Sequence, residues 1–174
     1  MVLYRPGLTD CQEPELYIRT ILYSLEHAVS DALLRNNGEI GRFNVVMDCE
    51  GMGRKSAPGL AYIKKGFTFL QDHYPDRLGV LLVANLSGIA QMMMKMVLPF
   101  VTEDVRSKIH IIPSDEKERR ELLLQFIDED QIPDWLGGKD EYRFESKDYY
   151  NGENKCVLSE EKIMEYRETM PYHA

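Results

Sequence analysis

Two kinds of hydrophobic pattern alternate along the chain. Short apolar runs predict four strands, at residues 2–4, 43–49, 79–86 and 108–112. The first run is ended by Pro6-Gly7 and is expected to be an edge strand. The third is almost continuously apolar, which is typical of a strand buried on both faces.

Between and after these runs, apolar residues recur at the spacing of helices. Helices are predicted at about residues 14–35, 58–74, 89–98 and 116–126. Pro14 suits the first turn of a helix, and Asn36-Asn37-Gly38 is a stop signal. Ser87 is placed to cap the third helix, and Asp115 has capping-box spacing to Glu118.

The alternation of strands and helices predicts an α/β fold, with a mostly parallel, twisted sheet covered by helices. The compact pattern ends at Gly137-Gly138. We therefore divide the chain into a lobe over residues 1–142 and a polar tail over 143–174. Ser159 is expected to cap a terminal helix in that tail, which would run to about Met170.

Composition narrows the function classes. The formal net charge of −8 argues against bulk binding of nucleic acid, which requires a basic surface. No apolar run reaches the ~18–20 residues of a membrane span, and no signal peptide is visible, so a cytoplasmic setting with peripheral membrane contact is expected. The three cysteines, Cys11, Cys49 and Cys156, are widely separated, which favours a reduced compartment.

Candidate chemistry is sparse. The four histidines show no metal-ligand spacing, and no nucleophile lies in a recognised catalytic motif. Gly53 is separated from Lys55-Ser56 by Arg54, which is wrong for a phosphate-binding loop. We accordingly expect no enzyme activity, no catalytic residue, no cofactor and no metal.

Four blocks in series carry a resemblance to a known family. They are Val45-Val-Met-Asp48-Cys-Glu-Gly51, Tyr74-Pro75-Asp76-Arg77-Leu78-Gly79, Leu98-Pro99-Phe100-Val101, and Ile127-Asp128-x-x-Gln131-Ile132-Pro133-x-x-Leu136-Gly137-Gly138. In this order they resemble the C-terminal lobe of Sec14-like (CRAL-TRIO) domains. The helical N-terminal lobe usual in that family has no counterpart in the sequence, and Leu98 stands where a basic residue is frequent.

The resemblance implies that the chain binds a hydrophobic small molecule, with a phospholipid such as phosphatidylinositol as the expected ligand and transfer between membranes as the activity. It implies a pocket above the sheet that is covered by a mobile, methionine-rich gate helix. The pocket and gate residues would be Phe67, Leu70, Leu81, Val83, Met92, Met96, Val97 and Phe100. On their periodicity alone the methionines are better explained as core filler, because methionine adapts to irregular gaps, and only the resemblance favours a gate.

The resemblance also implies two headgroup candidates. Asp76 corresponds to the family's acidic residue in the Tyr-Pro block, and Lys108 to the lysine just before the following isoleucine, here Ile109. A lysine can pair with phosphate, and a carboxylate can accept hydrogen bonds from hydroxyls. The alternatives are a turn residue for Asp76 and a solvated charge for Lys108.

Other functions remain open at this point. A protein-interaction or scaffolding module of Sec14-like or STAS-like architecture is the main alternative, and a hydrolase that depends on Asp48 is a third. Without the N-terminal lobe, apolar surface must be covered by the tail, by a second copy of the chain or by a protein partner.

Overall fold

The computed structural model describes residues 1–8, 14–39, 41–53, 56 and 59–143. Its centre is a parallel sheet of four strands in the order β1-β2-β3-β4. The strands are β1 (Val2–Tyr4), β2 (Phe43–Asp48), β3 (Leu78–Ala84) and β4 (Ile109–Ile111). The predicted α/β class and the edge position of the first strand are confirmed.

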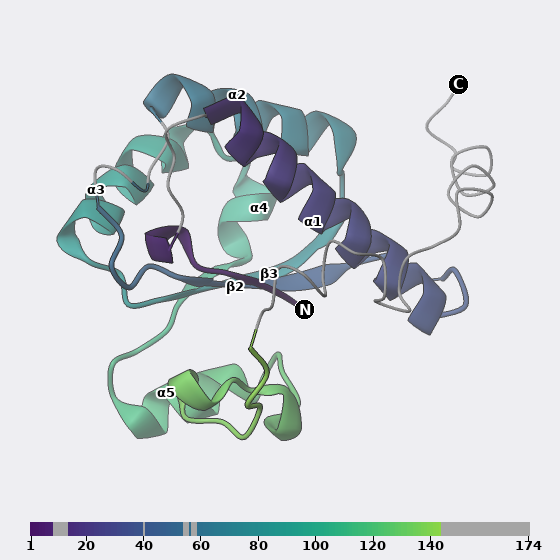
Figure 1. Cartoon of the computed structure of the whole chain (residues 1–174), viewed down its shortest axis with the longest axis vertical. Coiled ribbons are helices and arrows are strands. Elements are labelled where there is room, and N and C mark those ends of the chain that lie inside the picture. The colour runs from purple at the N-terminus through teal and green to yellow at the C-terminus, as the bar shows by residue number, and fades with distance from the viewer. Residues whose placement is uncertain (9–13, 40, 54–55, 57–58, 144–174) are drawn as a thin grey trace.

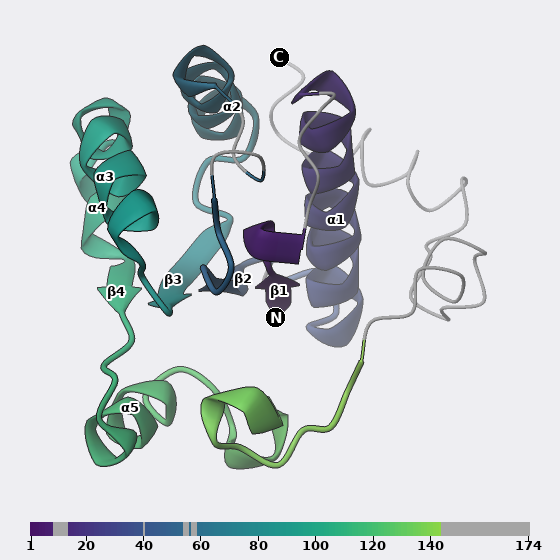
Figure 2. The same cartoon turned by 60° about the vertical axis from the view of Figure 1, so that its left-hand side comes forward.

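Four helices lie on one face of this sheet (Figure 1; Figure 2). They are α1 (Pro14–Arg35), α2 (Leu60–His73), α3 (Gly88–Val97) and α4 (Glu103–Ser107). The strands occur in chain order across the sheet, and parallel strands are joined by right-handed crossovers, so successive connecting helices fall on the same face. The opposite face is covered by α5 (Glu116–Leu123) and the short 3-10 helices Glu129–Gln131 and Asp134–Leu136.

The local signals for helix starts are confirmed where they can be seen. The Ser87 hydroxyl accepts a hydrogen bond from the Ala90 N–H at 3.4 Å, and the Asp115 carboxylate accepts one from the Glu118 N–H at 3.0 Å. α2 begins at Leu60, while Pro58 lies outside the described residues. The hydrogen bonds to Ser87 and Asp115 satisfy backbone N–H groups that the start of a helix leaves without partners.

Several element ends differ from the predicted ones by one to three residues, and α5 stops at Leu123 where the pattern predicted about residue 126. β3 stops at Ala84, two residues earlier than expected, because Asn85 takes a left-handed backbone conformation with φ 50° that no strand can continue. α3 stops at Val97, and the chain goes on as a 3-10 helix over Leu98–Phe100, with Pro99 inside it. α4, between this turn and β4, is an element that the hydrophobic pattern did not reveal.

The two faces of the sheet are packed differently. Val46 and Leu82 are fully buried on the α5 side and form one cluster with Leu123 and Ile132. On the side of α1 to α4, β2 and β3 present residues that are mostly only partly buried. The largest buried cluster therefore lies on the α5 side, below the sheet. Two smaller clusters, around Leu25 and Val83, lie on the other side, above the sheet, where open space also remains.

Of the predicted tail, the structure describes only its first residue, Arg143. The Arg143 guanidinium lies 2.7 Å from the Asp134 carboxylate. The predicted terminal helix falls within 144–174, outside the described residues, so the division into lobe and tail stays a prediction. Within the described part of the chain, no helix combines the length and the apolar character needed to cross a membrane.

Candidate ligand-binding cavity

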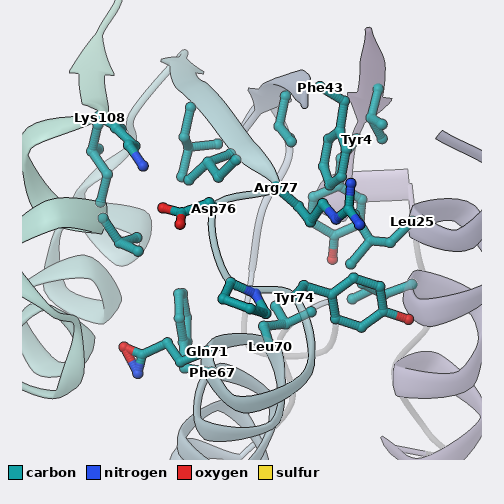
Figure 3. A pocket seen from close by; sticks show the side chains of 18 of the residues that line it. Tyr4, Leu25, Phe43, Phe67, Leu70, Gln71, Tyr74, Asp76, Arg77 and Lys108 are labelled. Atoms are coloured by element: carbon teal, nitrogen blue, oxygen red, sulfur yellow. The ribbon is translucent and has the colours of Figure 1, made fainter. Parts of the chain in front are cut away.

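A cavity of about 710 Å³ lies between the helices and the sheet. Its described lining comes from all four strands and from α1, α2 and α4, together with the turn that precedes β3. Figure 3 shows this space, with Tyr4, Phe67 and Leu70 among the side chains around it. The volume is within the range of known small-molecule pockets, about 300–1,000 Å³.

A second cavity of about 260 Å³ adjoins the first, toward α3. Six residues line both cavities: Tyr4, Ile21, Phe67, Leu70, Leu81 and Ile109. The described residues around the second cavity include no charged side chain. The two adjoining cavities are together called the hollow, and its part toward α3 is apolar.

The register of the strands explains the floor of this hollow. Val2 pairs with Val45, Val45 with Leu81, and Leu81 with Ile109, so these residues form a row across the sheet. All four line the larger cavity. Because side chains alternate between the faces of a strand, Leu82 in the next row points to the α5 side, where it is fully buried.

The amino-terminal edge of the sheet carries the charged part of the lining. Asp76, Arg77, Asp104 and Lys108 all border the larger cavity. The Lys108 ammonium lies 2.7 Å from the Asp104 carboxylate, and the lysine side chain is only 23% exposed. In Figure 3 the Asp76 carboxylate and Lys108 are directed toward the same part of the cavity, while Arg77 extends toward α1.

Asp76 is held in place by its backbone. It sits in a turn after Pro75 with φ 56°, in the left-handed region that aspartate tolerates better than most residues. The Arg42 guanidinium donates a hydrogen bond to the Asp76 carbonyl oxygen at 3.1 Å. Asp76 is thus both a turn residue and a residue whose carboxylate lines the larger cavity.

Two contacts connect α2 to the segment that carries α3 and α4. The Gln71 side-chain oxygen accepts a hydrogen bond from the Thr102 backbone N–H at 3.2 Å. The Lys64 ammonium lies 3.8 Å from the centre of the Phe100 ring, in a cation–π contact. These contacts link α2 to the turn after α3 and to the start of α4.

α3 is apolar on two sides. Ala90, Met93, Met94 and Val97 line the second cavity. Ile89, Met92, Met96 and Phe100 are 36–56% exposed. Spacings of three and four residues place Ile89, Met92 and Met96 on one face of α3, and Phe100 follows in the 3-10 helix. An apolar residue on both sides is unusual for a surface helix, which normally has one polar face.

The carboxyl-terminal edge of the sheet holds a buried carboxylate. Asp48 is fully buried and accepts hydrogen bonds from the Arg5 guanidinium at 2.8 Å, the Asn85 side chain at 2.8 Å and the Glu50 N–H at 3.0 Å. These three hydrogen bonds compensate for the burial of the Asp48 carboxylate, which indicates a structural role for this residue. Beside it, burial and the neighbouring Asp48 charge raise the pKa of the Cys49 thiol to about 11.

Comparison with known proteins agrees with this architecture. A family model described as the CRAL/TRIO domain matches residues 1–138. The chain belongs to the CRAL/TRIO family. Members of this family bind lipids or other small hydrophobic molecules, and they are generally not enzymes.

Three CRAL/TRIO relatives show the extent of the similarity. The Sec14 cytosolic factor of Schizosaccharomyces pombe is 33% identical over 94 residues, which are 53% of this chain and 32% of the relative. A protein named real-time from Drosophila pseudoobscura is 25% identical over 137 residues, 76% of this chain and 20% of the relative. A CRAL-TRIO domain-containing protein of Caenorhabditis elegans is 27% identical over 101 residues, 57% of this chain and 14% of the relative. The chain thus matches at most about a third of each relative's length.

The site residues expected from the sequence are distributed unevenly. Phe67, Leu70 and Leu81 line both cavities, Val97 lines the second, and Asp76 and Lys108 line the first. Val83, Met92, Met96 and Phe100 line neither cavity. Val83 is fully buried against Cys49 and Ala90, and the other three lie on the exposed side of α3 and the turn after it.

Several lining residues were not expected from the sequence. They come from β1, α1 and β2, and they are Val2, Tyr4, Ile21, Leu25, Phe43 and Val45. Met93 and Met94 line the second cavity in place of Met92 and Met96. A helical-wheel projection anchored on Val97 would have indicated Met93 and Met94, which precede it by four and three residues.

Proposed function

We propose that the chain binds an amphiphilic lipid, with its apolar chains over the sheet and its polar head at the amino-terminal edge. A phospholipid such as phosphatidylinositol is the proposed ligand. The observation that supports this best is the segregation of the lining: four charged residues border the larger cavity, and none of the described residues around the second is charged. An amphiphile bound here would have one favoured orientation.

The proposed headgroup contacts are made by Lys108 and Asp76. The ammonium would bind a phosphate oxygen, and the carboxylate would accept hydrogen bonds from hydroxyl groups. Because Lys108 is already paired with Asp104, the phosphate has to compete for it. Two acids and two bases balance at this edge, which suits a headgroup with both phosphate and hydroxyls more than one with phosphates alone.

α3 is the proposed gate. Its inner side closes the second cavity, and its outer side presents Met92, Met96 and Phe100 to the surface. Against a membrane, the exposed side would enter the interface, where apolar residues are stable. The Lys64–Phe100 and Gln71–Thr102 contacts would then have to break before α3 moves away from α2.

No chemical step is required for the proposed activity. Each methylene group transferred from water to the hollow is stabilised by about 0.8 kcal/mol, so a long acyl chain has a strong tendency to stay bound in water. A membrane offers the acyl chain an equally apolar environment, so the lipid exchanges at the membrane. Transfer between membranes would follow from repeated exchange.

Lipid extraction followed by a transfer assay tests the proposal. Native mass spectrometry of the purified chain should reveal a bound lipid, and vesicles should load the emptied chain. Ile109→Trp fills the hollow and should abolish loading, whereas Ile111→Trp, on the same strand but 55% exposed and outside both cavities, should not. A chain that neither carries nor takes up lipid would contradict the proposal.

A scaffolding role is the second candidate, and the exposed side of α3 is what favours it. Apolar residues on the outside of a helix are also typical of a surface that binds another protein. A stoichiometric protein partner that protects Met92 and Met96 from oxidation, with no lipid in the hollow, would favour this function over lipid binding.

A further inference from the structure

Sulfur-containing side chains are concentrated in one part of the hollow. Met47, Cys49, Met52, Met93 and Met94 all line the second cavity. None of the described residues around the larger cavity is a methionine or a cysteine. The two parts of the hollow therefore differ in polarisability as well as in charge.

These five side chains reach the cavity from separate parts of the chain. Met47 is on β2, Cys49 and Met52 lie in the segment after β2, and Met93 and Met94 come from α3. Sulfur thus borders the cavity from the sheet side and from the helix side. The raised pKa of Cys49 keeps its thiol neutral at physiological pH, so all five act as uncharged, soft groups.

Thioether sulfur makes favourable contacts with π-electron systems, and it does so best at the edge of an aromatic ring. Tyr4 and Phe67 also line this cavity, so an aromatic group there would have ring neighbours as well. The volume, about 260 Å³, is sufficient, since an apolar cavity of about 150 Å³ in another protein binds benzene.

We propose that the second cavity is a specificity site for an aromatic group at the apolar end of the ligand, in preference to a saturated chain of the same size. The proposal rests on the proposed function, because it assumes that a hydrophobic ligand enters the hollow. The charged edge of the larger cavity would hold the polar end of the ligand, and the sulfur-lined cavity would hold its far end. The residues that determine the preference are Met93 and Met94, with Met47 and Met52 opposite them.

Two fatty acids with the same number of carbons test the preference. ω-Phenyldodecanoic acid ends in an aromatic ring, and octadecanoic acid is saturated. The wild-type chain should bind the phenyl acid about threefold to tenfold more tightly, which is the range that one or two sulfur–aromatic contacts provide. Calorimetry on the delipidated chain measures both affinities.

The structure offers a matched pair of variants on one helix. Met93→Leu/Met94→Leu removes two thioethers from the cavity, and Met92→Leu/Met96→Leu removes two from the exposed side of the same helix. Leucine conserves volume well enough for both proteins to fold. The first variant should reduce the preference to less than twofold, and the second should leave it unchanged.

Nuclear magnetic resonance of ¹³C-methyl methionine provides a direct second measurement. The methyl signals that disappear in Met93→Leu/Met94→Leu should shift most when the phenyl acid binds, because of the ring current. Equal affinities of the two acids for the wild-type chain, or a preference that persists in Met93→Leu/Met94→Leu, would overturn this inference and leave lipid binding intact. Failure of both acids and of vesicle lipids to bind would instead overturn the proposed function.

Discussion

The Arg5 guanidinium Nε lies 2.8 Å from Oδ2 of Asp48, so the residue after the edge strand neutralises a carboxylate that solvent does not reach. The other oxygen of Asp48 accepts hydrogen bonds from Asn85 and from the Glu50 N–H. Arg5 also lies over the Trp135 ring at 5.2 Å. The Arg5–Asp48 ion pair joins the residue after β1 to the end of β2. The further contacts of these two residues reach Asn85 after β3 and Trp135 on the α5 side of the sheet.

We expect Arg5→Met to lower the free energy of unfolding by about 2–4 kcal/mol, because it leaves the buried Asp48 charge without its cation. Glu50→Gln is the control. The Glu50 side chain is 70% exposed and lies 3.3 Å from the same arginine, so its loss should change stability by less than about 1 kcal/mol. Urea denaturation measures both. Equal effects of the two variants would contradict the structural role assigned to Asp48.

Cys49 should react slowly with thiol reagents at neutral pH. Its pKa is raised from the ordinary value of 9.0 to about 11 by burial and by Asp48. The folded state therefore holds the thiol proton more tightly than the unfolded state does. The stability associated with this difference is fully present below about pH 9 and is lost as the pH rises from about 9 to 11.

The Cys49 prediction is measured in a chain with Cys11→Ser and Cys156→Ser, where one thiol remains. The alkylation rate of Cys49 should increase toward pH 11. At a given pH, the rate should be lower when lipid occupies the second cavity, which Cys49 lines. Cys49→Val should lose the part of the stability change between pH 9 and 11 that belongs to this thiol. Alkylation at the rate of the denatured chain would argue against a buried thiol.

Lys108→Met should weaken binding of phosphatidylinositol about tenfold, because a hydrogen bond to a charged group contributes about 1.5–3 kcal/mol. Asp104 already competes for the ammonium, so the lower part of that range applies. Lys117→Met, on α5 with a side chain 86% exposed, is the control and should bind normally. If Lys108→Met binds phosphatidylinositol as well as the wild type does, Lys108 is not a headgroup ligand.

Met92→Glu should reduce association with lipid vesicles at least about tenfold, since it places a charge in the apolar side of α3 that is proposed to enter the membrane interface. The side chain is 56% exposed and lines neither cavity, so folding and lipid loading from detergent should remain. Leu124→Glu introduces the same charge at an exposed leucine just after α5, below the sheet. Co-sedimentation with vesicles should separate the two variants. Equal losses would indicate a nonspecific effect of charge.

The order and type of the main elements could be predicted because each signal is local. Proline and cap residues mark helix starts, and apolar runs mark strands, as at Ser87 and β3. The end of β3 was missed because the left-handed conformation of Asn85 has no unambiguous signature in a single sequence. α4 was missed because a helix of only five residues carries too few apolar positions to show a period.

The site was harder to predict than the fold. The resemblance named residues of β3 and α2 that border the larger cavity, whereas the positions of Tyr4, Ile21 and Val45 depend on which elements become neighbours in the fold. A run of adjacent apolar residues also conceals which of them face the hollow. Leu81 and Val83 share one face of β3, yet only Leu81 lines the hollow, because Cys49 and Ala90 pack onto Val83.

The unequal packing of the two sheet faces has a consequence for how such a chain can change over time. Side chains below the sheet, such as Leu82 and Leu123, are surrounded by others, so their replacement leaves voids that destabilise the fold. Side chains such as Val45 and Ile109 border empty space and have fewer neighbours to lose. Ligand preference can therefore diverge by substitution above the sheet, while the layer below preserves the architecture.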